Sequence, residues 1–97
     1  MSTPPLDHPD EDLTLLRSGI TEQACARIVA KHGPLVMAAC RRILRDEGLA
    51  EDAAQETFVL LIQKARTLSD GTPVAGWLYH AACRIAGNAA FDEFGSS

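Results

Sequence analysis

Apolar residues recur every three or four positions along most of the chain, and no stretch shows sustained alternation of apolar and polar residues. This spacing is typical of helices that bury one face. The clearest example is the stripe of Ala54, Phe58, Leu61, Ala65 and Leu68, and a second inner stripe is formed by Val74, Leu78, Ala81 and Ile85. Because β-branched residues are few and 97 residues suffice for one domain only, the sequence predicts an all-α fold, a compact bundle of four to five helices.

Glycine and proline divide the chain into expected helices. Thr21 is placed to cap a helix that reaches His32, and its apolar Ala24, Cys25, Ile28 and Val29 are expected to point inward. Gly33 is a natural stop, and Pro34 suits the first turn of a new helix, whose apolar set is Leu35, Val36, Ala39, Cys40, Ile43 and Leu44. Gly48 then breaks the chain again. The expected helices cover residues 10–17, 21–32, 34–45, 50–67 and 74–89. We expect a disordered acidic tail over 1–9, one helical domain over 10–94 and a short end over 95–97.

The net charge of −4 hides a segregation of charges along the chain. Four acids precede residue 13, and a second acidic block follows the arginines at 41, 42 and 45. From Thr57 to Phe91, Asp70 is the only acid against three basic residues, so this stretch is net basic by two. An acidic chain is a poor first guess for a nucleic-acid protein, but its average charge says little about one face.

Several classes of protein are disfavoured by what the sequence lacks. It contains no apolar run near the roughly 20 residues that span a bilayer, and its start does not resemble a secretory signal. We therefore expect a cytoplasmic protein with no membrane partner. Cys25, Cys40 and Cys83 lie among apolar residues, which favours packing over disulfides or zinc. No phosphate loop or nucleophile motif occurs, so we expect neither an enzyme nor a cofactor.

Two stripes remain when the core positions are removed. The first mixes amide, acidic and apolar side chains, which suits docking against a helix with basic groups: Asp52, Gln55, Glu56, Val59 and Gln63. An ordinary solvated face is the alternative. The second places an aromatic ring before a basic and an amide residue, as in surfaces that bind unpaired bases: Trp77, His80, Arg84 and Asn88. Trp77 taken alone is equally a core residue.

The stretches GLAEDAAQETFVLLIQKA and GWLYHAACRIAGNAA, preceded by DLTLLRSG and RRILRD, resemble region 2 of bacterial RNA polymerase sigma factors, most closely the extracytoplasmic-function group. The resemblance covers about Asp12 to Ala90. It implies that the first stripe docks on the clamp helices of the polymerase beta-prime subunit. It also implies that the last helix melts the promoter minus-ten element, with the loop over 68–73 beside a flipped base.

The resemblance also implies where DNA would lie on this chain. The positions that match the family's DNA-facing side are Trp77, His80, Arg84 and Asn88. The basic residues expected to add DNA contacts are Arg41, Arg42, Arg45, Lys64 and Arg66, although composition alone favours a solvated face for the three arginines. Three positions depart from the family pattern, where Asn, Asp and Arg are common: Arg84, Asn88 and Phe91. Because the second, helix-turn-helix domain of such factors is missing from these residues, we expect a fragment or a stand-alone relative that binds single-stranded promoter DNA weakly. The alternative is a sigma-like interaction module that binds polymerase or an anti-sigma factor without promoter recognition.

Overall fold

The computed structural model describes residues 11–69 and 71–95, which form four helices and no strand. The helices are α1 (Glu11–Ser18), α2 (Glu22–Ile43), α3 (Glu47–Lys64) and α4 (Val74–Gly95). The predicted all-α fold is thereby confirmed. The tail expected over 1–9 and the last two residues lie outside the described part of the chain.

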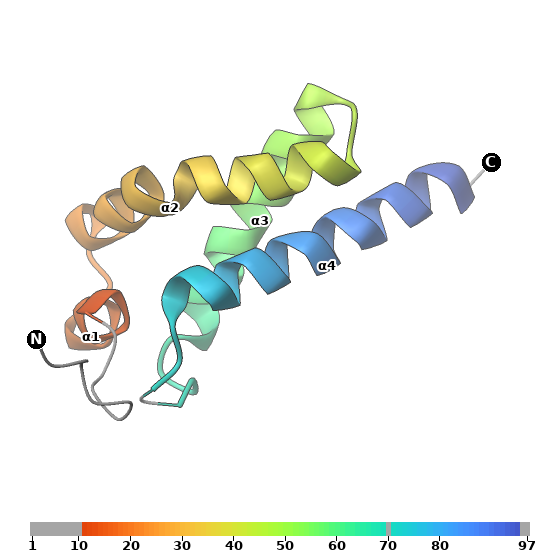
Figure 1. The fold of residues 1–97 in the computed structure, drawn as a ribbon. Helices are drawn as coiled ribbons and strands as arrows, with labels where there is room; N and C mark the ends of the chain where they lie inside the picture. Colours follow the sequence, from red (N-terminus) through yellow and green to blue (C-terminus); the bar gives the residue numbers. More distant parts are fainter. Residues whose placement is uncertain (1–10, 70, 96–97) are drawn as a thin grey trace, which may run out of the picture.

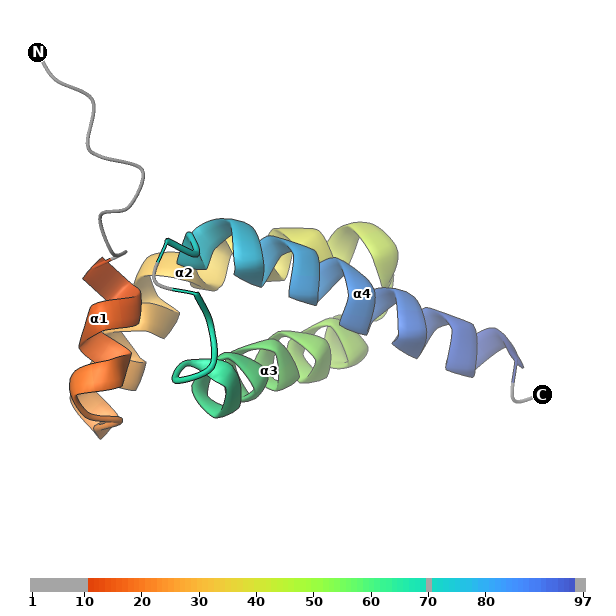
Figure 2. The same cartoon turned by 90° about the horizontal axis from the view of Figure 1, so that it is seen from below.

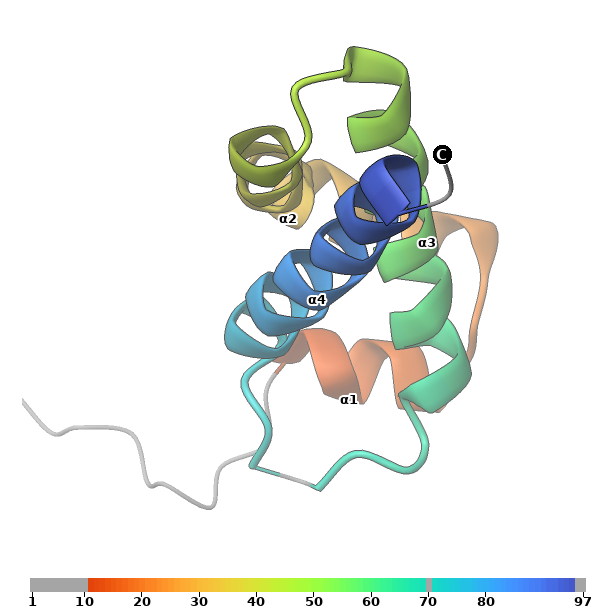
Figure 3. The same ribbon diagram turned by 90° about the vertical axis from the view of Figure 1, so that its right-hand side faces the viewer.

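The three long helices form the body of the bundle, and each contacts the other two. In Figures 1 and 2, α2 and α4 lie side by side and run in the same general direction, while α3 runs back against them. The short α1 lies across one end of this group and packs mainly on α2 (Figure 3). Helices α3 and α4 each keep an exposed face, and these two faces carry the stripes singled out above.

All four helices contribute side chains to one core. Leu13 and Leu16 of α1 are fully buried, although α1 has only 8 residues. The predicted inner stripe of α3 is confirmed, with Leu68 half-buried at its end. On α4 the predicted inner positions are also confirmed, with three buried and the fourth half-buried: Val74, Leu78, Ala81 and Ile85.

The predicted break at Gly33 is wrong, because residues 22–43 form the single helix α2 with Pro34 inside it. The buried positions explain this continuity. Ile28, His32 and Val36 follow each other at four-residue intervals, and only an uninterrupted helix keeps all of them facing the core. Pro34 lies on the exposed side of α2, so its ring points away from that packing.

The inward set predicted for this segment is partly wrong for the same reason. Val29, Leu35 and Ile43 are exposed by 45%, 39% and 37% respectively. With two separate helices these positions were free to rotate toward the core, whereas the phase of one long helix, set by its buried side chains, turns them toward solvent.

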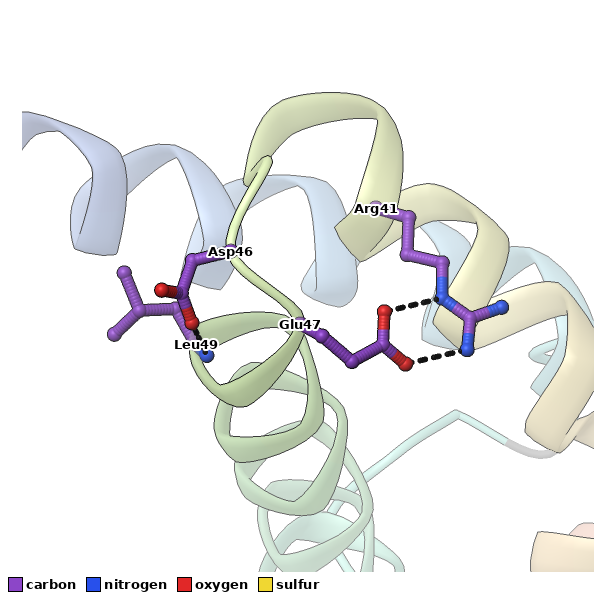
Figure 4. A network of polar contacts seen from close by, with 4 residues as sticks. All are labelled: Arg41, Asp46, Glu47 and Leu49. Atoms are coloured by element: carbon purple, nitrogen blue, oxygen red, sulfur yellow. Dashed lines mark hydrogen bonds and ion pairs between the residues drawn. The ribbon is translucent and has the colours of Figure 1, made fainter.

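At the corner between α2 and α3 a second predicted helix boundary is wrong. Gly48 does not break the chain but lies in the first turn of α3, which begins at Glu47 and ends at Lys64. The Asp46 side chain caps the helix by accepting a hydrogen bond from the Leu49 N–H at 2.9 Å. Arg41 Nε and Nη2 donate to the two carboxylate oxygens of Glu47 at 3.1 and 2.6 Å (Figure 4).

The predicted Thr21 cap of α2 is confirmed, since its hydroxyl accepts from the Ala24 N–H at 3.0 Å.

Candidate functional site

The first predicted stripe forms an exposed ridge along α3. All five of its side chains are exposed, and Val59 keeps 52% of its surface open to solvent: Asp52, Gln55, Glu56, Val59 and Gln63. These five residues are called the α3 ridge below. Because an exposed valine is flanked here by amides and carboxylates, the ridge has the mixed character of a protein-docking surface.

A shallow groove lies on each side of the α3 ridge. The groove toward α4 is lined by Leu49, Ala53 and Ala89, and the groove toward α2 by Val29, Met37 and Phe58. Asp52, Gln55 and Val59 border both grooves. A partner could therefore contact the ridge and bury apolar side chains in the floors beside it.

The charge around the α3 ridge is acidic. From Asp46 to Gln63 the chain contains five acidic residues and no Lys or Arg. Hydrogen bonding from Arg41 lowers the pKa of the Glu47 carboxyl, which is therefore already paired within the chain. The carboxylates of Glu51, Asp52 and Glu56 lie in the part of α3 up to residue 56 and are exposed, so the ridge favours a basic partner.

The second predicted stripe lies on the exposed face of α4. His80, Arg84 and Asn88 are exposed, whereas Trp77 is half-buried and packs against the core. The half-buried position of Trp77 is thus compatible with both interpretations, because part of its side chain packs on the core and part remains exposed to a partner. The stripe is called the α4 stripe below.

One residue missed in the sequence extends the α4 stripe. Phe91 lies three residues beyond Asn88 on the same helical face and is 76% exposed. The sequence already contained this signal, because Phe91 continues the spacing of three or four residues that defines the α4 stripe. A second aromatic ring, that of Tyr79, lies edge-on to His80 with 6.0 Å between the ring centroids.

The other basic residues that were predicted to bind DNA form two groups rather than one patch. Arg41, Arg42 and Arg45 are exposed at the C-terminal end of α2, next to the start of α3. Lys64 and Arg66 are exposed at the opposite end of α3. A helix of 18 residues separates the two groups by roughly 25 Å, so one short DNA segment would not contact both through a compact surface.

A polar cluster that sequence reasoning missed holds α1 against α2. His32, expected near a helix end, lies inside α2 and is buried, and its Nε2 lies 2.7 Å from Oδ2 of the buried Asp12. Lys31 Nζ lies 3.1 Å from the same oxygen. Burial raises the pKa of Asp12, but the hydrogen bonds from His32 and Lys31 outweigh it and leave the pKa below its ordinary value of 3.8.

The described residues give little support for a metal site or a reactive cysteine. Within 11–69 and 71–95 no three His, Cys, Asp or Glu side chains gather in a way that could hold a metal ion. The three cysteines are free thiols, and burial raises the pKa of Cys40. No helix in this part of the chain is long and apolar enough to cross a membrane.

Comparison with known protein families identifies the family of this chain. The family model of sigma-70 region 2 matches residues 28–95, which is well over half of the chain. The chain belongs to the sigma-70 region 2 family. Neither a curated protein nor a solved structure matches it significantly.

The match places both stripes inside the sigma-70 region 2 domain. It begins within α2 and extends through α3 and α4, so the α3 ridge and the α4 stripe lie within it. The helix α1 precedes the matched range, although its leucines are part of the same core. Sigma-70 region 2 is a domain of transcription initiation factors, and the helical bundle agrees with this membership.

Proposed function

We propose that this sigma-70 region 2 domain docks on core RNA polymerase through the α3 ridge and contacts single-stranded DNA of the promoter minus-ten element through the α4 stripe. The polymerase element would be the clamp helices of the beta-prime subunit, as in the extracytoplasmic-function group. The observation that carries the proposal is the presence of two chemically different exposed stripes on two separate helices of one small domain. Separate surfaces allow the polymerase and the DNA to be bound at the same time.

The composition of the α3 ridge supports the polymerase contact. Interfaces between proteins combine an apolar centre with hydrogen-bonding groups and a polar rim. Val59 supplies exposed apolar surface beside Gln55, and the two grooves add apolar floors. The surrounding carboxylates would steer a basic helical surface toward the ridge.

A double substitution on the α3 ridge tests the docking. Asp52→Lys combined with Gln55→Ala is expected to weaken binding to core polymerase by about tenfold or more, because it reverses a charge and removes an amide at the centre of the ridge. Co-purification with core polymerase measures the loss. Glu22→Lys combined with Gln23→Ala makes the same two changes at exposed positions of α2 and should leave binding intact. Equal binding by both variants, with unchanged helicity, would refute the assignment of this face.

The chemistry of the α4 stripe supports the DNA contact. Unpaired bases stack on aromatic rings, accept hydrogen bonds from arginine, and both accept them from and donate them to asparagine. No acidic residue occurs between Gly71 and Phe91, so this interval itself contains no carboxylate that would repel phosphates. Since Arg84 is the one Lys or Arg in that interval, its electrostatic contribution is modest, and we expect weak binding by the isolated domain.

Substitutions on the α4 stripe test the DNA contact with a short labelled single-stranded oligonucleotide of mixed sequence at low salt. Arg84→Ala should weaken binding and reduce the salt dependence by about one counterion. Trp77→Ala should remove roughly 1–3 kcal/mol of binding free energy and also lower the Tm, because the ring packs on the core. Arg27→Ala removes an exposed cation from α2 and is the matched control. A lower Tm with unchanged affinity would make Trp77 a core residue only.

One observation favours a second candidate function, a sigma-like module that binds polymerase or an anti-sigma factor without recognising a promoter. Phe91 is 76% exposed where the family pattern commonly has a basic residue, so this end of the α4 stripe is apolar rather than cationic. Binding to polymerase by a chain with no affinity for single-stranded DNA at low salt would support this second function.

A further inference from the structure

The end of α3 is held by a side chain from a distant part of the sequence. Arg17 Nε of α1 donates a hydrogen bond to the Ala65 carbonyl oxygen at 3.1 Å, and its Nη2 donates to the Leu68 carbonyl oxygen. Ala65 is the C-terminal cap of α3 and Leu68 lies in the turn that follows, where carbonyl oxygens lack a helical N–H partner. A cation at a helix C-terminus is also favoured by the helix dipole. Arg17 thus caps α3 from outside.

Arg17 is itself attached to a firmly placed helix. Leu13 and Leu16 of α1 are fully buried in the core, and Asp12 is bonded to His32 of α2. In Figure 3, α1 lies across the end of the bundle where α3 finishes and α4 begins. The helix α1 therefore connects the middle of α2 to the connection between α3 and α4.

The residues that Arg17 holds lead directly into the α4 stripe. Leu68 packs on the core by its side chain, while its carbonyl accepts from Arg17. A turn closed by the Thr72 N–H and the Ser69 carbonyl at 3.0 Å follows, and the Pro73 carbonyl accepts from the Trp77 N–H at 3.0 Å. Leu68 and Trp77 both pack against the same core, so a displacement at Leu68 alters the packing from which the α4 stripe begins.

We propose that Arg17 is a positioning residue for single-stranded DNA, because its hydrogen bonds to Ala65 and Leu68 hold residues 65–69 in place relative to the start of the α4 stripe at Trp77. This inference rests on the proposed function of the α4 stripe. Arg17 does not touch the DNA. Arg17 raises the fraction of molecules in which residues 65–69 keep this conformation, and the apparent affinity for DNA falls in proportion when that fraction falls.

The test compares Arg17→Ala with Arg27→Ala, which removes the same charge from an exposed site on α2. Amide hydrogen exchange reports on the connection through Leu68 and Thr72, whose N–H groups are bonded within it. In Arg17→Ala we expect these amides to exchange about tenfold faster, while core amides of α2 keep their rates. We expect the affinity for the mixed-sequence oligonucleotide to fall about two- to tenfold relative to Arg27→Ala.

Arg17→Lys provides a second variant that keeps the charge. A single ammonium lacks the planar fork that presents two donors to two carbonyls, so its exchange and affinity should lie closer to those of Arg17→Ala than to the wild type. If Arg17→Lys behaves as the wild type, charge alone explains the effect and the positioning role is overturned.

The remaining outcomes separate this inference from the proposed function. Unchanged exchange at Leu68 and Thr72 in Arg17→Ala overturns the positioning role regardless of the DNA result. Faster exchange with an affinity equal to that of Arg27→Ala makes Arg17 purely structural. A wild-type chain that does not bind the oligonucleotide refutes the DNA contact itself, and the positioning role with it. Polymerase binding, which uses the α3 ridge, should be unchanged in every Arg17 variant.

Discussion

Replacing Leu61 with alanine is expected to lower the free energy of unfolding by about 3 kcal/mol, a large part of the stability of a domain this small. Leu61 lies on the inner face of α3 and is 1% exposed. It lines a small void together with Leu16 of α1, Ile28 of α2 and Phe58 of its own helix. Truncation would enlarge that void where three helices meet, and the surrounding side chains would relax only partly.

Leu35→Ala is the matched control for this prediction. It makes the same chemical change on α2 at a side chain that is 39% exposed. Urea unfolding followed by far-UV circular dichroism should therefore show a much smaller loss for Leu35→Ala than for Leu61→Ala. Equal losses in the two variants would mean that Leu61 does not occupy the shared core.

Replacing Asp12 with alanine is the second change with a large expected effect, a loss of about 2–3 kcal/mol in the free energy of unfolding. The substitution leaves His32, which is 7% exposed, without the carboxylate at 2.7 Å. A buried donor without an acceptor carries the full cost of its desolvation. Lys31 is less affected, because 57% of its side chain is exposed and can turn to water.

The pH dependence of stability gives an independent check on the same contact. Burial raises the pKa of Asp12, and the bonds to His32 and Lys31 lower it further than burial raises it, so the folded value lies below 3.8. The unfolded chain then takes up the proton first as the pH falls. The stabilisation is therefore complete above the unfolded pKa of 3.8 and is lost as the pH falls through the folded pKa.

Two asparagine variants separate this contribution from general acid unfolding. Asp12→Asn removes the titration, so its stability should depend less on pH than that of the wild type below about pH 4. Asp52→Asn makes the same chemical change at an exposed position of α3 and is the matched control. Unfolding midpoints in urea, measured across this pH range, provide the comparison. Parallel slopes for Asp12→Asn and the wild type would contradict the buried contact.

The buried and exposed positions of α3 and α4 were predictable from the sequence, because residues three or four positions apart lie on the same face of a helix. The inner stripes of α3 and α4 were found from their apolar residues alone, and the exposed residues of the α3 ridge are what remains on the same helix. Glycine and proline were less reliable guides. Gly33 and Gly48 were both taken as breaks, yet both lie inside helices, because packing of the buried face outweighs the roughly 1 kcal/mol that glycine costs.

Pairings between distant residues were not predictable from the sequence. Asp12 was counted as one of the four acids that precede residue 13, and nothing near it in the chain indicates His32, which is 20 positions away. Arg17 was one cation among nine, and its acceptors are backbone carbonyls 48 and 51 positions away. A carbonyl oxygen has no residue-specific signal, so only the folded backbone shows where it points.

The sequence by itself determined that the chain is helical, which faces are inner and outer on α3 and α4, and the family to which the two stripes belong. These properties depend on side chains three to four positions apart, which share a face in any α-helix. Only the tertiary structure decided that α2 continues through Pro34, that α1 is held by Asp12, and that Arg17 caps α3. These features depend on which helices meet, and their free energy comes from burial and hydrogen bonds that exist only once the bundle has closed.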